Sequence, residues 1–211
     1  HRDVPILKKN TFYSFLELEH LYDSAIELVK TQLNIFDNEF SMRFQRNPIH
    51  NIESRIKSPQ SIIGKLQRKG FAVSPESARI HLQDIAGVRV ICYYVDDIYA
   101  IANLLTEHSA FQLKRIKDYI KNPKLNGYRS FHMILNVPVY MANGKEFAPV
   151  EIQIRTIAMD FWASLEHQLH YKSIGNQDVS ASLTDELKQC AETIAETDLK
   201  MQDMFKEISR L

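Results

Sequence analysis

Two acidic residues, Asp84 and Glu151, have neighbours suited to phosphate chemistry. Asp84 stands in the segment Gln83–Arg89, whose small residues could bring the backbone close to a ligand just before a strand. Apolar and polar residues alternate in Val150–Arg155, which predicts Glu151 on the polar face of a strand. Phosphoryl or pyrophosphoryl transfer asks mainly for carboxylates that bind Mg²⁺ and for bases that bind phosphate oxygens. We therefore predict one Mg²⁺ site built from Asp84 and Glu151, the alternative being a turn residue and an exposed strand charge.

Basic residues gather ahead of Asp84, although the formal net charge of the whole chain is zero. From Arg43 to Arg89 there are nine Lys or Arg and three Asp or Glu, a local balance of +6. Such a stretch in a neutral protein favours a compact anionic ligand, so RNA binding is not indicated. The residues predicted to converge on a triphosphate are Arg55, Lys57, Ser61, Lys65 and Arg68. The alternative is a solvated basic helix face.

A third cluster surrounds a loop that contains a glycine. Arg115–Ile120 precedes the loop, and Pro123–His132 forms it. An aromatic ring beside Lys, Asn, Arg and His suits the stacking of one base and the binding of its phosphates. A hairpin tip would explain Asn126 and Gly127 alone, but it gives no reason for so many hydrogen-bonding side chains.

Apolar periodicity, capping residues and β-branched runs predict the elements that must position these clusters. The predicted helices are Phe12–Phe36, Pro59–Gly70 with Ser58 as N-cap, Asp96–Glu107, Ile157–Ser173 and Thr184–Leu211. The predicted strands are Val88–Tyr94, Phe131–Tyr140 and Pro149–Arg155, the last two joined by a turn at residues 142–144. We expect one domain, with an N-terminal helical segment over 1–50, a core over 51–175 and a C-terminal helix over 176–211.

Composition excludes several classes of protein. With 45% hydrophobic residues the chain can bury a substantial core, and its uncharged runs are too short to cross a bilayer, so a cytoplasmic protein is expected. The two cysteines, Cys92 and Cys190, are too few for a disulfide framework and are interpreted as buried thiols.

One rival site contains two histidines on a single helix. His167 and His170 stand near Glu166, a spacing that could bind a transition metal. The pattern lacks a third distant ligand, and hydrogen-bonded helix histidines are commoner, so a structural role is favoured.

The motifs together resemble the synthetase domain of the RelA/SpoT family, and the size of the chain is similar to a stand-alone small alarmone synthetase. The resemblance covers Arg55–Tyr171. It is carried by Arg-x-Lys-x-x-x-Ser at 55–61, Asp-Ile-Ala-Gly-Val-Arg at 84–89, Arg-Ile-Lys-Asp-Tyr-Ile at 115–120, Lys-x-Asn-Gly-Tyr-Arg-Ser-x-His at 124–132, Val-Glu-Ile-Gln-Ile-Arg at 150–155 and Trp-Ala-x-x-Glu-His at 162–167.

The resemblance implies an α+β fold with a nucleotidyltransferase-like mixed sheet flanked by helices, and long helices at both ends. It implies transfer of pyrophosphate from ATP to the 3′-hydroxyl of GDP or GTP, with Mg²⁺ as cofactor. Asp84 and Glu151 would be catalytic and hold the metal, and Glu151 would also take the proton of the 3′-hydroxyl.

The remaining roles implied by the resemblance divide between the two nucleotides. Those assigned to ATP are Arg55 and Arg89 around adenine, with Lys57, Ser61, Lys65 and Arg68 toward the phosphates. Tyr128 would stack on guanine. The other residues assigned to the guanosine nucleotide are Lys117, Lys124, Asn126, His132, Gln153 and Arg155. Asp160 receives no role.

The same resemblance implies a homotetramer, and the last helix supports self-association independently. Its apolar residues repeat at three- and four-residue steps: Leu187, Cys190, Ile194, Thr197, Met201, Met204, Ile208 and Leu211. Packing of this seam on its own domain is the alternative. Two other functions stay open, an inactive nucleotide- or RNA-binding regulator of the same fold and a related nucleotidyltransferase that releases pyrophosphate.

Overall fold

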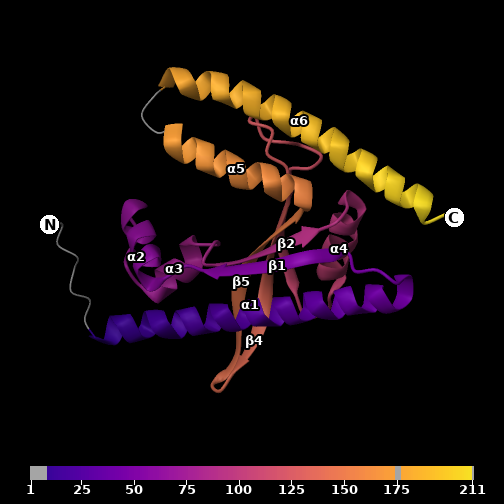
Figure 1. Ribbon diagram of the computed structural model, residues 1–211. Coiled ribbons are helices and arrows are strands. Elements are labelled where there is room, and N and C mark those ends of the chain that lie inside the picture. Colours follow the sequence, from indigo (N-terminus) through magenta and orange to yellow (C-terminus); the bar gives the residue numbers. More distant parts are fainter. Residues whose placement is uncertain (1–8, 174–176, 211) are drawn as a thin grey trace.

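A five-stranded mixed sheet forms the centre of the protein (Figure 1). The computed structural model describes residues 9–173 and 177–210, with side chains for 13–169 and 183–210. The strands are β1 (Ile49–Ile56), β2 (Ala86–Cys92), β3 (Gln112–Asp118), β4 (Phe131–Met141) and β5 (Gly144–Thr156), in the spatial order β1-β2-β5-β4-β3. Only β2 and β5 are parallel neighbours among these strands. The predicted α+β class with a mixed sheet is confirmed.

Helices cover the sheet and extend beyond it (Figure 1). They are α1 (Lys9–Phe44), α2 (Pro59–Arg68), α3 (Pro75–His81), α4 (Val95–Glu107), α5 (Ile157–Ser173) and α6 (Gln177–Ile208). Helix α1 crosses the sheet and contacts β1, β2, β4 and β5, whereas α5 and α6 pack on each other. None of the helices in the described ranges is long and apolar enough to cross a membrane.

The main core lies between α1 and one face of the sheet. Phe15, Tyr22 and Leu33 of α1 are fully buried, as are Val150 and Ile152 of β5. Burying each large apolar side chain contributes about 1.5–3 kcal/mol to folding. Because side chains alternate along a strand, this burial turns the polar residues of β5 toward the opposite face, as the sequence predicts.

Two helices begin with the same type of N-terminal cap. Ser58 accepts a hydrogen bond from the Ser61 amide ahead of α2, and Ser74 caps α3 in the same way, each before a proline at the first helical position. The cap of α2 confirms the prediction, although the helix ends at Arg68 and not at Gly70. Helix α3 is missing from the predicted elements because its seven residues are too short to show apolar periodicity.

Several boundaries differ from the predicted ones because packing partners extend the elements. Helix α1 runs to Phe44 and ends where Gln45 adopts a left-handed φ of 55°. Strand β5 begins at Gly144, since it pairs with β4 from Gly144 to Ile154. Strand β1 was not predicted, because most of its residues at the sheet edge are exposed and show no alternation.

The seam predicted on α6 is partly covered by its own domain. Ala191, Asp198 and Gln202 of the helix are buried, and Leu187 and Ile194 of the seam pack beside Ala191. Met201 and Ile208 of the seam are exposed, and self-association through them stays a prediction. The burial predicted for Cys92 is confirmed, whereas Cys190 is exposed, so the prediction of a second buried thiol is wrong. The side chain of Leu211 lies outside the described residues.

Candidate active site

Two rows of side chains cross the sheet on the face away from α1. The register of the strands aligns Arg55, Gly87, Glu151, Ile134 and Arg115 in the first row. The second row, two residues along each strand, is Glu53, Arg89, Gln153, His132 and Lys117. Residues two apart point to the same face. Strand pairing therefore gathers residues that lie up to about a hundred positions apart in the sequence, one of them contributed by each strand in each row.

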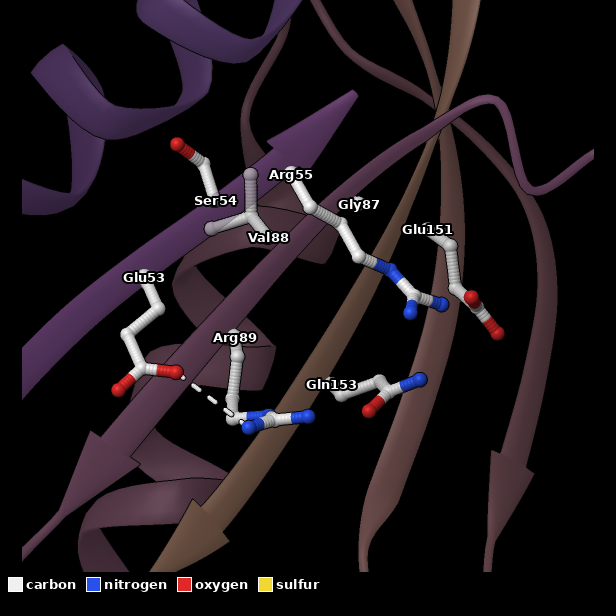
Figure 2. A pocket seen from close by; sticks show the side chains of 8 residues that line it. All are labelled: Glu53, Ser54, Arg55, Gly87, Val88, Arg89, Glu151 and Gln153. Carbon is white, nitrogen blue, oxygen red and sulfur yellow. Dashed lines mark hydrogen bonds and ion pairs between the residues drawn. The ribbon is translucent and has the colours of Figure 1, made fainter. Parts of the chain in front are cut away.

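Glu151 stands where three hollows of this face meet. The first, of about 130 Å³, is lined by Arg55, Arg89 and Gln153 (Figure 2). The second, of about 200 Å³, includes Lys117 and His132 in its lining, and Glu151 borders it as well.

The third hollow, of about 240 Å³, is lined by Asp84, Lys65 and Arg115 together with Glu151. Each of the three is smaller than the roughly 300 Å³ at the low end of ligand pockets, so a nucleotide would occupy more than one. The two predicted carboxylates thus border one space, which is the condition for a shared metal.

Asp84 is held by two lysines at the end of the sheet. Its Oδ2 accepts hydrogen bonds from Lys57 Nζ at 2.7 Å and Lys65 Nζ at 2.5 Å. Burial alone would raise the pKa of this carboxyl, but the hydrogen bonds and charges of the two lysines outweigh it and lower the pKa to about 2. Asp84 is therefore ionised at neutral pH. Its other oxygen, Oδ1, is buried and has no hydrogen-bond partner among the described residues.

An unpartnered carboxylate oxygen is costly in a folded protein unless a ligand satisfies it. Oδ1 of Asp84 is such an oxygen, and Asp84 lines the third hollow together with Glu151. Mg²⁺ is usually held by one or two carboxylates, with waters and phosphates as its other ligands. Within residues 13–169 and 183–210 no group of three or more His, Cys, Asp or Glu could hold a metal. The residues present fit a Mg²⁺ that completes its coordination with substrate.

Ion pairs hold the guanidinium group of Arg89 beside the first hollow. Arg89 lies 3.3 Å from Glu53 and 3.6 Å from Asp160, which also binds Arg155 at 3.1 Å. Figure 2 shows Arg55 extending over Gly87 toward Glu151, with Arg89 below it. The two guanidinium groups predicted for adenine thus border the same hollow.

Hydrogen bonds connect His132 to Tyr128 and Arg155. Arg155 donates to the Tyr128 hydroxyl at 2.7 Å, and that hydroxyl is hydrogen-bonded to Nε2 of His132 at 2.8 Å. Nδ1 of His132 faces Glu151 Oε1 at 3.7 Å. Burial, followed by the charges of Arg155, Lys124 and Lys117, lowers the pKa of His132 to about 4. The ring is neutral at pH 7, so this contact is polar and not an ion pair.

The loop between β3 and β4 is braced by its own predicted site residues. Asn126 accepts from the Tyr128 amide and donates to Glu166. Lys124 lies over the Tyr128 ring at 4.6 Å and over the Tyr119 ring at 4.9 Å. The composition of this loop therefore reflects internal contacts as well as groups free to meet a ligand.

The structure does not bring every predicted site residue to the three hollows. Those that line none of the three are Lys57, Ser61, Arg68, Asn126, Tyr128 and Arg155. Ser61 bonds to the cap residue Ser58, and Arg155 is only 5% exposed. The polar lining residues to which the sequence prediction gave no individual role include Glu53, Lys69, His81, Gln83, Arg115 and Tyr119. Arg115 and Tyr119 lie in the predicted third cluster, and Arg115 shares a face of β3 with Lys117 two residues on.

The rival metal site finds no support in the described residues. His167 is exposed and belongs to no potential ligand group within residues 13–169 and 183–210. The side chain of His170 lies outside the described residues. Glu166 instead accepts the hydrogen bond from Asn126.

Comparisons with known proteins agree on one group of relatives. A family model described as "Region found in RelA / SpoT proteins" matches residues 54–176. The GTP pyrophosphokinase YwaC of Bacillus subtilis is 46% identical over 188 residues, 89% of each chain. The crystal structure of small alarmone synthetase 2 from Bacillus subtilis has a TM-score of 0.78 at 46% identity and covers 90% of this chain and 98% of that one. The structure of small alarmone synthetase 1 bound to its product pppGpp has a TM-score of 0.79 at 32% identity, with 92% and 97% covered.

Proposed function

Because the chain belongs to the RelA/SpoT family, we propose a course for the reaction on the face of the sheet that carries Glu151. The activity is that of a GTP pyrophosphokinase, which transfers the β,γ-pyrophosphate of ATP to the 3′-hydroxyl of GDP or GTP. One observation carries the assignment of the site. Among the residues that the structure describes, Glu151 is the only one that lines all three hollows: the one beside Arg55 and Arg89, the one beside Lys117 and His132, and the one beside Asp84.

The donor nucleotide lies along the side of the sheet formed by β1 and β2. Arg55 and Arg89 take the adenine, since flat guanidinium groups stack well on aromatic rings. Lys57 and Lys65 both form ion pairs with Asp84, and their positive charges suit the phosphates of ATP. Ser61 and Arg68 belong to the same helix as Lys65 and complete this proposed phosphate side.

The acceptor nucleotide lies along the side formed by β3 and β4. Lys117, Lys124 and His132 line the second hollow and present cations and a neutral imidazole to it. Tyr128 stacks on guanine in this proposal, with the guanine replacing Lys124 over the ring. Asn126, Gln153 and Arg155 shape this side, and Arg155 does so by holding the Tyr128 hydroxyl.

The chemical step needs one base and one leaving group. The 3′-oxygen of the guanosine nucleotide forms a bond to the β-phosphorus of ATP, while the bond from that phosphorus to the α,β-bridging oxygen breaks and AMP leaves. The proton of the 3′-hydroxyl passes to the carboxylate of Glu151, the group shared by donor and acceptor sides. The lysines and arginines around it neutralise the charge that develops on the transferred phosphates.

Asp84 and Glu151 hold Mg²⁺ in this proposal, supported by the unpartnered Oδ1 of Asp84. When bound there, the ion would supply positive charge that neutralises part of the negative charge of the phosphates. Lys57 and Lys65 keep the Asp84 carboxylate ionised before metal and substrate arrive.

Product analysis tests the proposed course directly. The purified protein is incubated with ATP, Mg²⁺ and GMP, GDP or GTP in turn, and the products are identified by mass. We expect AMP together with a guanosine nucleotide that carries a 3′-pyrophosphate. Release of pyrophosphate would instead indicate nucleotidyl transfer, and no turnover with any acceptor would leave a binding protein.

We also propose that the chain assembles as a homotetramer in the cytoplasm, where its nucleotide substrates are made. Support for assembly comes from apolar residues left exposed on two helices. On α5 they recur every four residues at Ile157, Phe161, Leu165 and Leu169, and on α6 they include Leu199, Met201, Met204 and Ile208. Exposed apolar stripes of this kind mark protein interfaces. Light scattering at micromolar concentration should give four times the mass of the chain, and a monomer would contradict the proposal.

A further inference from the structure

We propose that α6 is part of the acceptor site, and that Ala191 acts as a positioning residue for the loop that carries Tyr128. The inference rests on the proposed role of this loop in binding the guanosine nucleotide. It concerns a helix that lies outside residues 54–176, the region matched by the family model. Three separate contacts connect the helix to the loop.

The closest contact joins the backbone of Gly127 to Ala191. A Cβ atom at Gly127 would lie 2.5 Å from Cβ of Ala191 and 3.1 Å from Cα of Lys188. Gly127 also has φ of +92°, a conformation that side chains rarely tolerate. The loop therefore rests directly on α6, and both partners must be small for it to do so.

A second contact binds the loop to the helix through one guanidinium group. Arg129 donates from Nη1 to the carbonyl oxygen of Gly127 at 3.2 Å and to that of Ala191 at 3.3 Å. The same nitrogen thus bridges the residue before Tyr128 and the helix. Since Arg129 follows Tyr128 directly, the residues on both sides of the proposed stacking ring are tied to α6.

The third contact belongs to a set of hydrogen bonds that anchor α6 to α5 and to the end of β5. Trp162 of α5 donates from its indole nitrogen to the Leu187 carbonyl oxygen at 3.0 Å and packs with Ala191 and Tyr128. About two turns along α6 from Ala191, the buried carboxyl of Asp198 accepts a hydrogen bond from Thr156 at 2.6 Å. Thr156 follows Arg155, the residue that holds the Tyr128 hydroxyl. The helix is therefore anchored on both sides of Ala191.

These contacts predict that a larger side chain at position 191 displaces the acceptor loop and leaves the donor side intact. Arg55 and Arg89 of the donor hollow lie on β1 and β2, and Arg89 forms its ion pairs with Glu53 of β1 and Asp160 of α5. A change on α6 should therefore separate the KM for the guanosine nucleotide from the KM for ATP.

The test measures both KM values and kcat for Ala191→Leu. We expect the KM for GDP to rise by about tenfold, equivalent to 1.4 kcal/mol of binding, while the KM for ATP stays within about twofold. Glu196→Leu, which places the same side chain on an exposed turn of α6, is the matched control and should leave both values unchanged. Equal changes in the two KM values, or no change in either, would overturn the inference.

A second pair of variants keeps the test informative if Ala191→Leu does not fold. Gly127→Ala should also raise the KM for GDP, and adding Ala191→Gly should recover part of that loss, because it removes the atom at 2.5 Å. Failure of Ala191→Gly to recover any of it would contradict direct contact. Loss of the proposed function is a separate result, since it would appear as absence of 3′-pyrophosphorylated product from the unaltered chain.

Discussion

Gly87 and Glu151 are paired across the parallel ladder between β2 and β5, and Arg55 crosses the space above Gly87 to point toward Glu151 (Figure 2). A Cβ atom at Gly87 would meet Cγ and Nε of Arg55 at 3.6 Å, an ordinary contact. The absence of a larger side chain in the middle of the row is what lets β1 contribute a guanidinium group to the site.

Substitutions at Gly87 should therefore depend on size. We expect Gly87→Ala to leave the KM for ATP within about twofold, and Gly87→Leu to raise it by about tenfold, equal to 1.4 kcal/mol, by displacing Arg55. Steady-state kinetics with ATP varied at saturating GDP measures the difference. Equal KM values for the two variants would show that Arg55 does not contact ATP.

Glu151→Gln should remove the base while keeping the shape of the side chain. We expect kcat to fall by about 10²- to 10⁴-fold, the usual contribution of a positioned base, with the Kd for ATP nearly unchanged. Calorimetry gives the Kd, and product formation gives kcat. Glu146→Gln, the same change on the half-exposed outer part of β5, is the matched control. Turnover close to that of the unaltered chain would remove the general-base assignment.

Asp84→Asn should raise the Mg²⁺ concentration needed for half-maximal activity. The change removes a charge that the two lysines hold ionised, and it weakens the proposed metal site by one carboxylate. Activity is measured against Mg²⁺ at constant free ATP, with Asp203→Asn on the exposed face of α6 as control. An unchanged Mg²⁺ dependence would place the metal elsewhere.

His132 should remain neutral well below the pH at which histidine ordinarily titrates. Burial lowers its pKa to about 4 in the folded chain, against about 6.5 when unfolded. NMR titration of the His132 ring signals measures this pKa, and a value of 6.5 or above would show that burial and the neighbouring cations do not keep the ring neutral.

The lowered pKa of His132 also makes the free energy of unfolding depend on pH. Between pH 6.5 and 4 the unfolded chain binds one more proton at this residue, so its contribution to stability is full above about pH 6.5 and is lost as the pH falls toward 4. The free energy of unfolding of His132→Gln should therefore decrease less than that of the unaltered chain over this interval. Parallel decreases would argue against the shift.

The local part of the fold was predictable because it depends on neighbours in the sequence. The Ser58–Pro59 cap, the alternation in β5 and the apolar stripe of α1 each arise from residues within a few positions of one another. Strand β1 was missed for the opposite reason. It is a strand because β2 pairs with it, and its exposed edge residues show no pattern of their own.

The candidate site, like the fold, was predictable only in part from the sequence. Residue types near Asp84 and Glu151 indicated phosphate chemistry, and the motifs indicated the family, which the comparisons confirm. Arg155 and Asn126 were predicted as ligand-binding residues from the same motifs, yet both form hydrogen bonds with Tyr128. A motif reports that a side chain is needed, but burial and hydrogen bonds decide whether it meets the substrate or supports a neighbour that does.

By itself the sequence determined the chemistry of the chain, namely two carboxylates, a basic stretch and an aromatic loop. These features could be recognised in the sequence because side-chain type and short-range spacing are local properties. The tertiary structure alone decided which residues face one another, because strand register and helix orientation follow from pairing and burial across the whole chain. That is how Glu151 comes to border three hollows, and how Ala191, which no motif singles out, comes to lie against Gly127.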